Sequence, residues 1–269
     1  MGGRRVALVS VLVTLFVAVG WAVSLTQASV GSGSVLPKTL SKLCGLPYVR
    51  GAVVQFSAGD GAPLVGAVAG RGKIGIVLTN TSDGEICDWV ASENKLINSL
   101  VGQGYRVLLF DYRGTGRSPK VVGKRSGAWG SDAIGAAAEL RRLGSSRIVL
   151  VGASTGGIVV LAIAHTVNAF AVVGLSASGD PGATSTSADK GGLDGKAAVK
   201  ALRVPLLFIA AKQDAYGFAP TEQLYRAAQT ADKQLLVVPG QAHGFFDLDP
   251  SGPKVDARIL DFIRTHARG

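Results

Sequence analysis

The 269-residue sequence is poor in cysteine, histidine and charged residues, and this scarcity argues against several classes of protein. It has two cysteines and three histidines, and none of them is arranged at the spacing of a zinc site, so no metal is expected. Lys and Arg outnumber Asp and Glu by 28 to 18, but they form no run with interleaved aromatic residues. Nucleic-acid binding is therefore not expected, and the net charge of +10 indicates either a basic surface or attraction to anionic polymers or envelopes.

A low share of charge goes together with a large apolar content. Charged residues make up 17% of the chain and hydrophobic residues 47%, so the chain can bury a large core and is not wholly disordered. From residue 35 onward it contains no internal repeat and no second linker. These features predict one folded domain after an N-terminal extension.

The N-terminus has the features of an export signal. Two arginines in "MGGRR" precede the almost wholly apolar residues 6–23, and small polar residues follow that would suit cleavage after Ala28. The apolar run is longer than a usual signal core and just reaches membrane-spanning length, so a retained anchor is the alternative. We expect residues 1–28 to be a signal peptide or membrane anchor and residues 29–48 a linker or N-terminal extension. The protein would then be secreted or attached to the outer face of the cell membrane.

The two cysteines, Cys44 and Cys87, are an even number in a chain that is expected to enter an oxidising compartment. Neither lies inside an expected helix or central strand. We predict a disulfide bond that closes a loop of about 43 residues, which contributes about 4 kcal/mol in the chain-entropy model. Two free buried thiols are the alternative.

Apolar strands alternate with helices over the rest of the chain. Continuously apolar strands separated by helices are typical of a parallel sheet covered on both faces, so we expect an α/β fold. The first two strands should form an antiparallel hairpin around "GDGAP". About eight strands are expected, over residues 48–58, 63–70, 73–80, 106–112, 147–152, 170–178, 205–211 and 233–240. Helices are expected over residues 89–101, 131–143, 156–165, 221–230 and 254–267.

The segment Gly152-Ala153-Ser154-Thr155-Gly156 fits the pattern G-x-S-x-G between a strand and a helix. The flanking glycines let the strand and the helix approach without a Cβ clash. The serine is thereby presented at the tip of the sheet and at a helix N-terminus, where N–H groups favour developing negative charge. Ser154 is the candidate nucleophile.

A serine hydroxyl is a poor nucleophile unless a base takes its proton. His243 lies in the loop "PGQAHGFF", directly after an expected strand, and can reach back over the tip of the sheet. His165 and His266 lie in or at the end of expected helices and are interpreted as surface or packing residues. His243 is therefore the candidate base.

The base needs a carboxylate to hold its tautomer. Asp214 follows the strand "PLLFIAA", which places Ser154, Asp214 and His243 in the chain order Ser-Asp-His. Asp180, after the preceding strand, and Asp247, four residues beyond the histidine, remain the alternatives.

Four segments resemble the α/β-hydrolase superfamily, of the compact esterase or dienelactone-hydrolase-like kind. They are "FDYRGTGRSP", "RIVLVGASTGG", "AKQDAYG" and "AHGFF". The resemblance extends from about residue 50 to the end, and it implies a hydrolase domain over residues 49–269. It further implies a mostly parallel sheet with helices on both faces and no large cap domain. Asp111 and Arg113 are expected to hold their loop together without a catalytic role.

One departure from the family concerns the oxyanion hole. The family commonly has His-Gly after the third strand, whereas Asn80 and Thr81 stand there in this sequence. Because the hole is built from backbone N–H groups, a changed side chain does not remove it. The expected donors are Thr155 N–H and the N–H of Thr81, with Ser82 as the alternative to Thr81.

Two features bear on the substrate. Residues 179–195 are rich in Gly, Ser and Asp and follow the carboxyl end of a strand, as either a flap or a solvated loop. A short polar insertion in place of an apolar lid favours small or accessible substrates. Four aromatic residues flank the acid and the base and form either an acyl pocket or ordinary core: Tyr216, Phe218, Phe245 and Phe246.

These residues predict a serine hydrolase that cleaves a small-molecule carboxylic ester through an acyl-enzyme, without a metal or an organic cofactor. Acyl transfer and peptide cleavage use the same three residues and are alternatives. A non-catalytic binding protein of the cell envelope, built on the same fold, is an alternative of a different class. The sequence does not indicate an oligomeric state.

Overall fold

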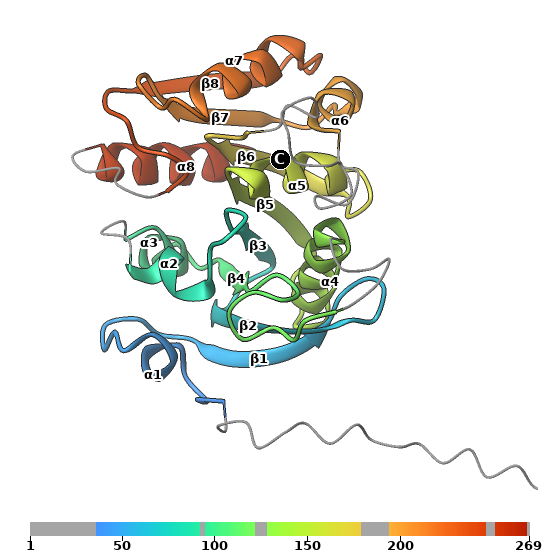
Figure 1. The fold of residues 1–269 in the computed structure, drawn as a ribbon, viewed down its shortest axis with the longest axis vertical. Helices are drawn as coiled ribbons and strands as arrows, with labels where there is room; N and C mark the ends of the chain where they lie inside the picture. The colour runs from blue at the N-terminus through green and yellow to red at the C-terminus, as the bar shows by residue number, and fades with distance from the viewer. Residues whose placement is uncertain (1–35, 92–94, 122–127, 179–193, 246–250, 268–269) are drawn as a thin grey trace, which may run out of the picture. The chain divides into compact units, whose positions relative to one another are not determined.

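A twisted sheet of eight strands forms the centre of the described residues in the computed structural model (Figure 1). The structure describes residues 36–91, 95–121, 128–178, 194–245 and 251–267. The strands are β1 (Ala52–Ser57), β2 (Pro63–Gly70), β3 (Ile74–Thr79), β4 (Arg106–Phe110), β5 (Arg147–Ala153), β6 (Ala169–Leu175), β7 (Leu206–Ala211) and β8 (Lys233–Val238). Their spatial order is β1-β2-β4-β3-β5-β6-β7-β8.

Strands β1 and β2 form the predicted hairpin, and β2 pairs antiparallel with β4. All pairs from β4 to β8 are parallel. Parallel strands end at one edge of the sheet, so the loops after β3, β5, β7 and β8 are brought together there. The predicted mostly parallel, eight-stranded sheet with an antiparallel start is confirmed.

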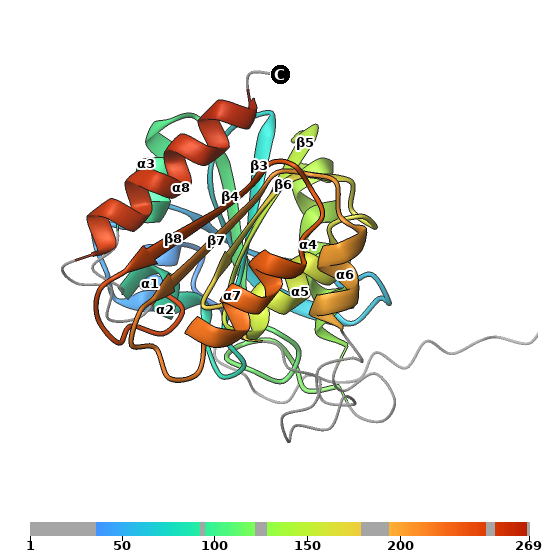
Figure 2. The same cartoon turned by 90° about the horizontal axis from the view of Figure 1, so that it is seen from above.

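Helices cover both faces of the sheet, as Figure 2 shows. On one face lie α1 (Leu40–Cys44), α2 (Ile86–Ala91), α3 (Leu96–Gly102) and α8 (Gly252–Ala267). On the other lie α4 (Trp129–Arg142), α5 (Thr155–Ile163), α6 (Gly195–Ala201) and α7 (Phe218–Ala227). Because side chains alternate along a strand, Ile76 and Leu78 of β3 join the first core and Val77 joins the second.

Two segments differ from a simple reading of the hydrophobic pattern. Where a single helix was expected over residues 89–101, the structure describes two helices, α2 and α3, and residues 92–94 lie outside the described residues. Part of the segment expected to be a linker forms α1, whose Leu40 and Leu43 are buried in the core. The expected export segment, including residues 6–23, lies outside the described residues, and no helix in the described part is long and apolar enough to cross a membrane.

Cys44 and Cys87 form a disulfide bond, as predicted. The bond joins the last residue of α1 to the second residue of α2, with 5.3 Å between the two Cα atoms. It thereby fixes the N-terminal segment to the helix that follows the β3 loop.

Removing this bond by Cys44→Ser with Cys87→Ser should lower the free energy of unfolding by about 2–4 kcal/mol, because the bond restricts a 43-residue loop in the unfolded chain. Urea unfolding of the variant beside the oxidised parent measures the effect. The parent treated with a reductant should shift in the same way, and an unchanged midpoint in both experiments would contradict the prediction.

Asp256 is a buried acid in the C-terminal helix α8. The residue is only 7% exposed, and its carboxylate accepts a hydrogen bond from the backbone N–H of Lys95. Burial raises the pKa of Asp256 from 3.8 to about 7, against the smaller lowering effect of that hydrogen bond. The folded protein therefore retains a proton that the unfolded chain releases, so stability falls as the pH rises from about 4 to 7.

Asp256→Asn should raise the midpoint of thermal unfolding at pH 8 by about 2–4 °C or more and leave it nearly unchanged at pH 4. The amide retains an acceptor for Lys95 N–H and removes the buried charge. Asp261→Asn is the matched control, because Asp261 is half-exposed on the same helix and paired with Arg258 and Arg264, so the variant should not be more stable than the parent at pH 8. Equal shifts of Asp256→Asn at both pH values would contradict the interpretation.

Candidate active site

Ser154 occupies a sharp turn between β5 and α5, with φ 52° and ψ −118°. This region of backbone space is strained for a residue with a side chain. The turn is tightly packed: a Cβ at Gly152 would lie 2.2 Å from Gly156 O, and a Cβ at Gly156 would lie 2.5 Å from Thr79 O and from Asn80 O. Both flanking positions therefore require glycine, which is the physical content of the G-x-S-x-G pattern.

The structure brings the predicted serine, histidine and aspartate into one hydrogen-bonded row. Ser154 Oγ lies 2.8 Å from His243 Nε2, and His243 Nδ1 lies 3.0 Å from both Asp214 carboxylate oxygens. The loops after β5, β7 and β8 supply the three residues. His165 is exposed beyond α5, and His266 packs on Phe262 within α8, so His243 is the histidine brought to Ser154.

The turn after β7 holds the Asp214 carboxylate in place. Its Oδ1 accepts hydrogen bonds from the N–H groups of Tyr216 and Gly217, at 3.0 Å and 2.9 Å. The side chain is almost fully buried, while that of His243 is partly exposed. The rival acids, Asp180 and Asp247, lie outside the described residues, and Asp214 is the acid in contact with His243.

The predicted oxyanion donors belong to the first turn of α5 and to the loop after β3. Thr155 is the first residue of α5, so its N–H has no acceptor within the helix. Thr81 is buried beside the histidine turn: a Cβ at Gly244 would lie 3.5 Å from Thr81 Cγ2 and 3.4 Å from Ala153 Cβ. The alternative donor, Ser82, is exposed to solvent. Thr81, rather than Ser82, is therefore the residue of this loop that is buried against the histidine turn.

The β3 loop that contains Thr81 is attached at both ends to the end of β4. At its start, Asn80 is buried and donates a hydrogen bond from Nδ2 to Phe110 O, at 2.8 Å. At its end, the Ile86 N–H donates to Asp111 Oδ1, at 2.7 Å. Burial raises the pKa of Asp111, although two backbone N–H groups bond to its carboxylate. Asn80, which stands where the family commonly has histidine, thus supports the loop through its side chain.

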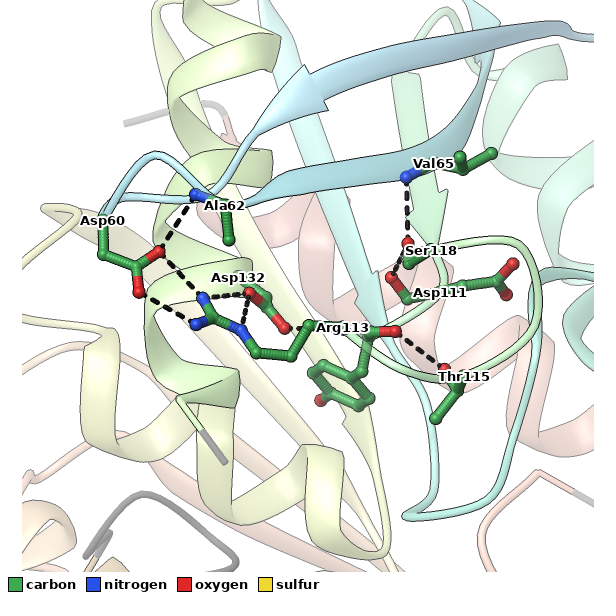
Figure 3. Close-up of polar contacts among 9 residues, drawn as sticks. Asp60, Ala62, Val65, Asp111, Arg113, Thr115, Ser118 and Asp132 are labelled. Atoms are coloured by element: carbon green, nitrogen blue, oxygen red, sulfur yellow. Dashed lines mark hydrogen bonds and ion pairs between the residues drawn. The ribbon is translucent and has the colours of Figure 1, made fainter. Parts of the chain in front are cut away.

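The loop after β4 is held by a buried ion-pair network (Figure 3). The Arg113 guanidinium lies between Asp60 of the β1–β2 turn and Asp132 of α4, with N···O distances of 2.8 Å and 2.6 Å. Hydrogen bonding to Arg113 lowers the pKa of Asp60 to about 2. Ser118 adds a second link, because its hydroxyl donates to Asp111 O and accepts from Val65 N–H. The predicted supporting role of Asp111 and Arg113 is confirmed by these contacts.

One residue at the site was not predicted. Ser178 Oγ lies 3.0 Å from Ser154 Oγ, just beyond the end of β6. Strand β6 is the parallel neighbour of β5, and Ala153 pairs with Leu175. The order of the strands would have been needed to find Ser178, because nothing in its local sequence distinguishes it.

The aromatic residues considered for an acyl pocket separate into different environments. Phe245 is buried and stacks on Trp89, with 4.0 Å between ring centroids, so it belongs to the core. Tyr216 is 78% exposed, and its ring centroid lies 6.2 Å from that of His243. Phe218 lies beneath the Lys212 ammonium group. Phe246 lies outside the described residues, as does nearly all of the Gly/Ser/Asp-rich segment.

In the described part of the chain, no group of three or more His, Cys, Asp or Glu side chains could hold a metal ion. The chemistry available at the site is that of a serine hydroxyl beside an imidazole, which can accept its proton, and a carboxylate that orients the imidazole.

The comparisons with known proteins identify the family. Residues 87–261 match the model of the alpha/beta hydrolase family, which covers more than half of the chain. The chain therefore belongs to the α/β-hydrolase family, as its motifs indicated. A search of curated proteins found no significant match.

Solved structures of esterases and lipases share the fold. An esterase domain from Rhodothermus marinus has a TM-score of 0.63 at 20% identity and covers 81% of this chain and 99% of its own. An esterase of Pyrococcus furiosus has a TM-score of 0.67 at 15% identity, with 87% and 98% covered. A serine hydrolase without a lid, from Xanthomonas campestris, has a TM-score of 0.59 at 17% identity, with 80% and 94% covered.

Gly217→Ala tests the geometry of the acid turn. A Cβ at this position would lie 2.2 Å from Asp214 Oδ2 and 2.6 Å from Ser176 Cβ, so the carboxylate must move away from His243. We expect turnover of p-nitrophenyl butyrate to fall by about 10- to 100-fold, because a small displacement of the reacting groups slows a reaction by this amount.

The matched control is Gly102→Ala, because a Cβ there meets no atom within 4 Å. It should retain parental turnover. Parental turnover by a folded Gly217→Ala variant would show that the tight turn does not control the position of Asp214.

Proposed function

We propose that this α/β-hydrolase is a serine carboxylesterase that works through an acyl-enzyme. The observation that carries the proposal is the hydrogen-bonded row of Ser154, His243 and Asp214, with the serine on a strained turn at the N-terminus of α5. A non-catalytic descendant of the fold would not need to preserve all three groups at these distances.

In the proposed reaction, Ser154 Oγ attacks the carbonyl carbon of the ester while His243 Nε2 takes the hydroxyl proton. The Asp214 carboxylate accepts the hydrogen bond from His243 Nδ1–H and stabilises the imidazolium. The N–H groups of Thr155 and Thr81 bind the oxyanion. His243 then gives the proton to the leaving alcohol, and water releases the acid from Ser154 in a second, analogous step.

Small carboxylic esters are the proposed substrates. Solved structures with this fold include esterases and a monoacylglycerol lipase, which favours esters over peptides. His243 is partly exposed and Tyr216 beside it projects into solvent, consistent with an accessible site. Acyl transfer to a carbohydrate or an alcohol in preference to water uses the same residues and would produce a new ester in place of the free acid.

We further propose that the protein is exported. Residues 1–28 would serve as a cleaved signal or as an anchor through residues 6–23, ahead of the hydrolase domain. The Cys44–Cys87 disulfide supports this placement, because such bonds persist mainly in oxidising compartments.

Labelling with a fluorophosphonate probe tests the nucleophile. The parent should be labelled and should hydrolyse p-nitrophenyl acetate and butyrate, whereas Ser154→Ala should lose labelling and at least about 1000-fold in turnover. Mass spectrometry of the labelled peptide should place the adduct on Ser154.

Heat-denatured parent is the control for non-specific reaction and should remain unlabelled. A folded parent that is neither labelled nor active on either ester would contradict the proposed function and favour a binding role. Equal labelling of Ser154→Ala would show that another residue is the nucleophile.

A further inference from the structure

The hydroxyl of Ser178 is in contact with the candidate nucleophile and is not part of the Ser-His-Asp row. Its Oγ lies 3.0 Å from Ser154 Oγ and comes from the end of a different strand. The backbone before it is well fixed: Ser176 N–H donates to Ile209 O at 2.7 Å, and Ala177 O accepts from Thr221 Oγ1 at 3.3 Å. The contact is therefore positioned by the fold.

The direction of this hydrogen bond follows from counting protons. His243 Nδ1 faces two carboxylate oxygens, so it carries the ring proton, and Nε2 is then the acceptor. Ser154 has one hydroxyl hydrogen, and Nε2 at 2.8 Å accepts it. The remaining hydrogen between the two serines must come from Ser178, which donates to Ser154 Oγ.

We propose that Ser178 assists deacylation by donating a hydrogen bond to Ser154 Oγ as this atom leaves the acyl group. The inference rests on the proposed function and adds to it a group that contacts the reacting oxygen. Its basis is the change in charge on Oγ during the reaction cycle.

In the acyl-enzyme, Ser154 Oγ is an ester oxygen and a weak acceptor, so the bond from Ser178 is weakened. Water then adds to the acyl carbon while His243 Nε2 takes a proton from it. When the tetrahedral intermediate collapses, the C–Oγ bond breaks, its electron pair passes to Oγ, and His243 returns the proton to Oγ. The carboxylic acid departs, and Ser178 donates to Oγ as its negative charge develops.

During acylation, the hydrogen bond from Ser178 contributes less to lowering the barrier than it does during deacylation. The free enzyme already has the hydrogen bond, so Ser178 stabilises the starting state of acylation as well as the transition state in which Oγ attacks the ester. Removing the donor therefore does not raise the barrier to acylation in the way that it raises the barrier to deacylation. This asymmetry distinguishes a role in deacylation from a merely structural one.

Ser178→Ala should slow deacylation by about 3- to 10-fold and leave acylation within about twofold of the parent. Stopped-flow release of p-nitrophenol from p-nitrophenyl acetate measures acylation, and acid-quenched mass spectrometry measures decay of the acetyl-enzyme. With deacylation limiting, kcat and KM should fall together at nearly constant kcat/KM. Ser178→Thr, which retains a hydroxyl, should deacylate faster than Ser178→Ala.

Ser146→Ala is the matched control, because it removes a hydroxyl at the opposite end of β5, where Ser146 Oγ contacts Lys73 O. It should leave both steps unchanged. The proposal is overturned if Ser178→Ala slows neither step or both equally, or if Ser178→Thr loses as much as Ser178→Ala. A parent that forms no acyl-enzyme contradicts the proposed function itself, which is a different result.

Discussion

The strained turn at Ser154 is the constraint on which the site depends. A positive φ at a non-glycine residue costs about 1–3 kcal/mol and persists only where the surrounding packing enforces it. The enforcing contacts are the close approach of α5 to the end of β5 at Gly152 and to the end of β3 at Gly156. The burial of the first turns of α5 in the core adds to them. Loss of this packing would release the turn and move the hydroxyl away from His243.

The parallel arrangement of the strands brings together residues that lie far apart in the sequence. Strands β5, β6, β7 and β8 are consecutive in the sheet and end at the same edge. The turns after them carry Ser154, Ser178, Asp214 and His243 in that order. These turns meet at the edge of the sheet, where Ser154 contacts both Ser178 and His243, and His243 contacts Asp214.

Contacts behind this row support the loop that carries Thr81. Asn80 attaches the start of the loop to Phe110 O, and Ile86 attaches its end to Asp111, so both ends are held by the end of β4. Cys87 follows Ile86 directly and is bonded to Cys44. A buried network around Arg113 in turn holds the β4 loop. The loop that carries Thr81 is thus kept in place by side chains other than Ser154, His243 and Asp214.

Local patterns in the sequence were sufficient for the fold class and for part of the site. Alternating apolar strands and helices predict the covered parallel sheet, because burial on both faces requires continuous apolar strands. The glycines around Ser154 mark the turn, since they reflect a local steric requirement. The chain has only three histidines, and the candidate base could be chosen by asking which of them follows an expected strand. The disulfide partners also followed from the sequence, because the chain has only two cysteines.

Other features depend on contacts between distant segments, and only the tertiary structure decided them. The sequence left three aspartates as candidates for the acid, and the structure places the carboxylate of Asp214 in contact with His243 Nδ1. Phe245 proved to be core because it stacks on Trp89, which lies far from it in the chain. Ser178 is set beside Ser154 by strand order alone. Local sequence patterns record steric and burial requirements within an element, whereas these positions result from which strands become neighbours.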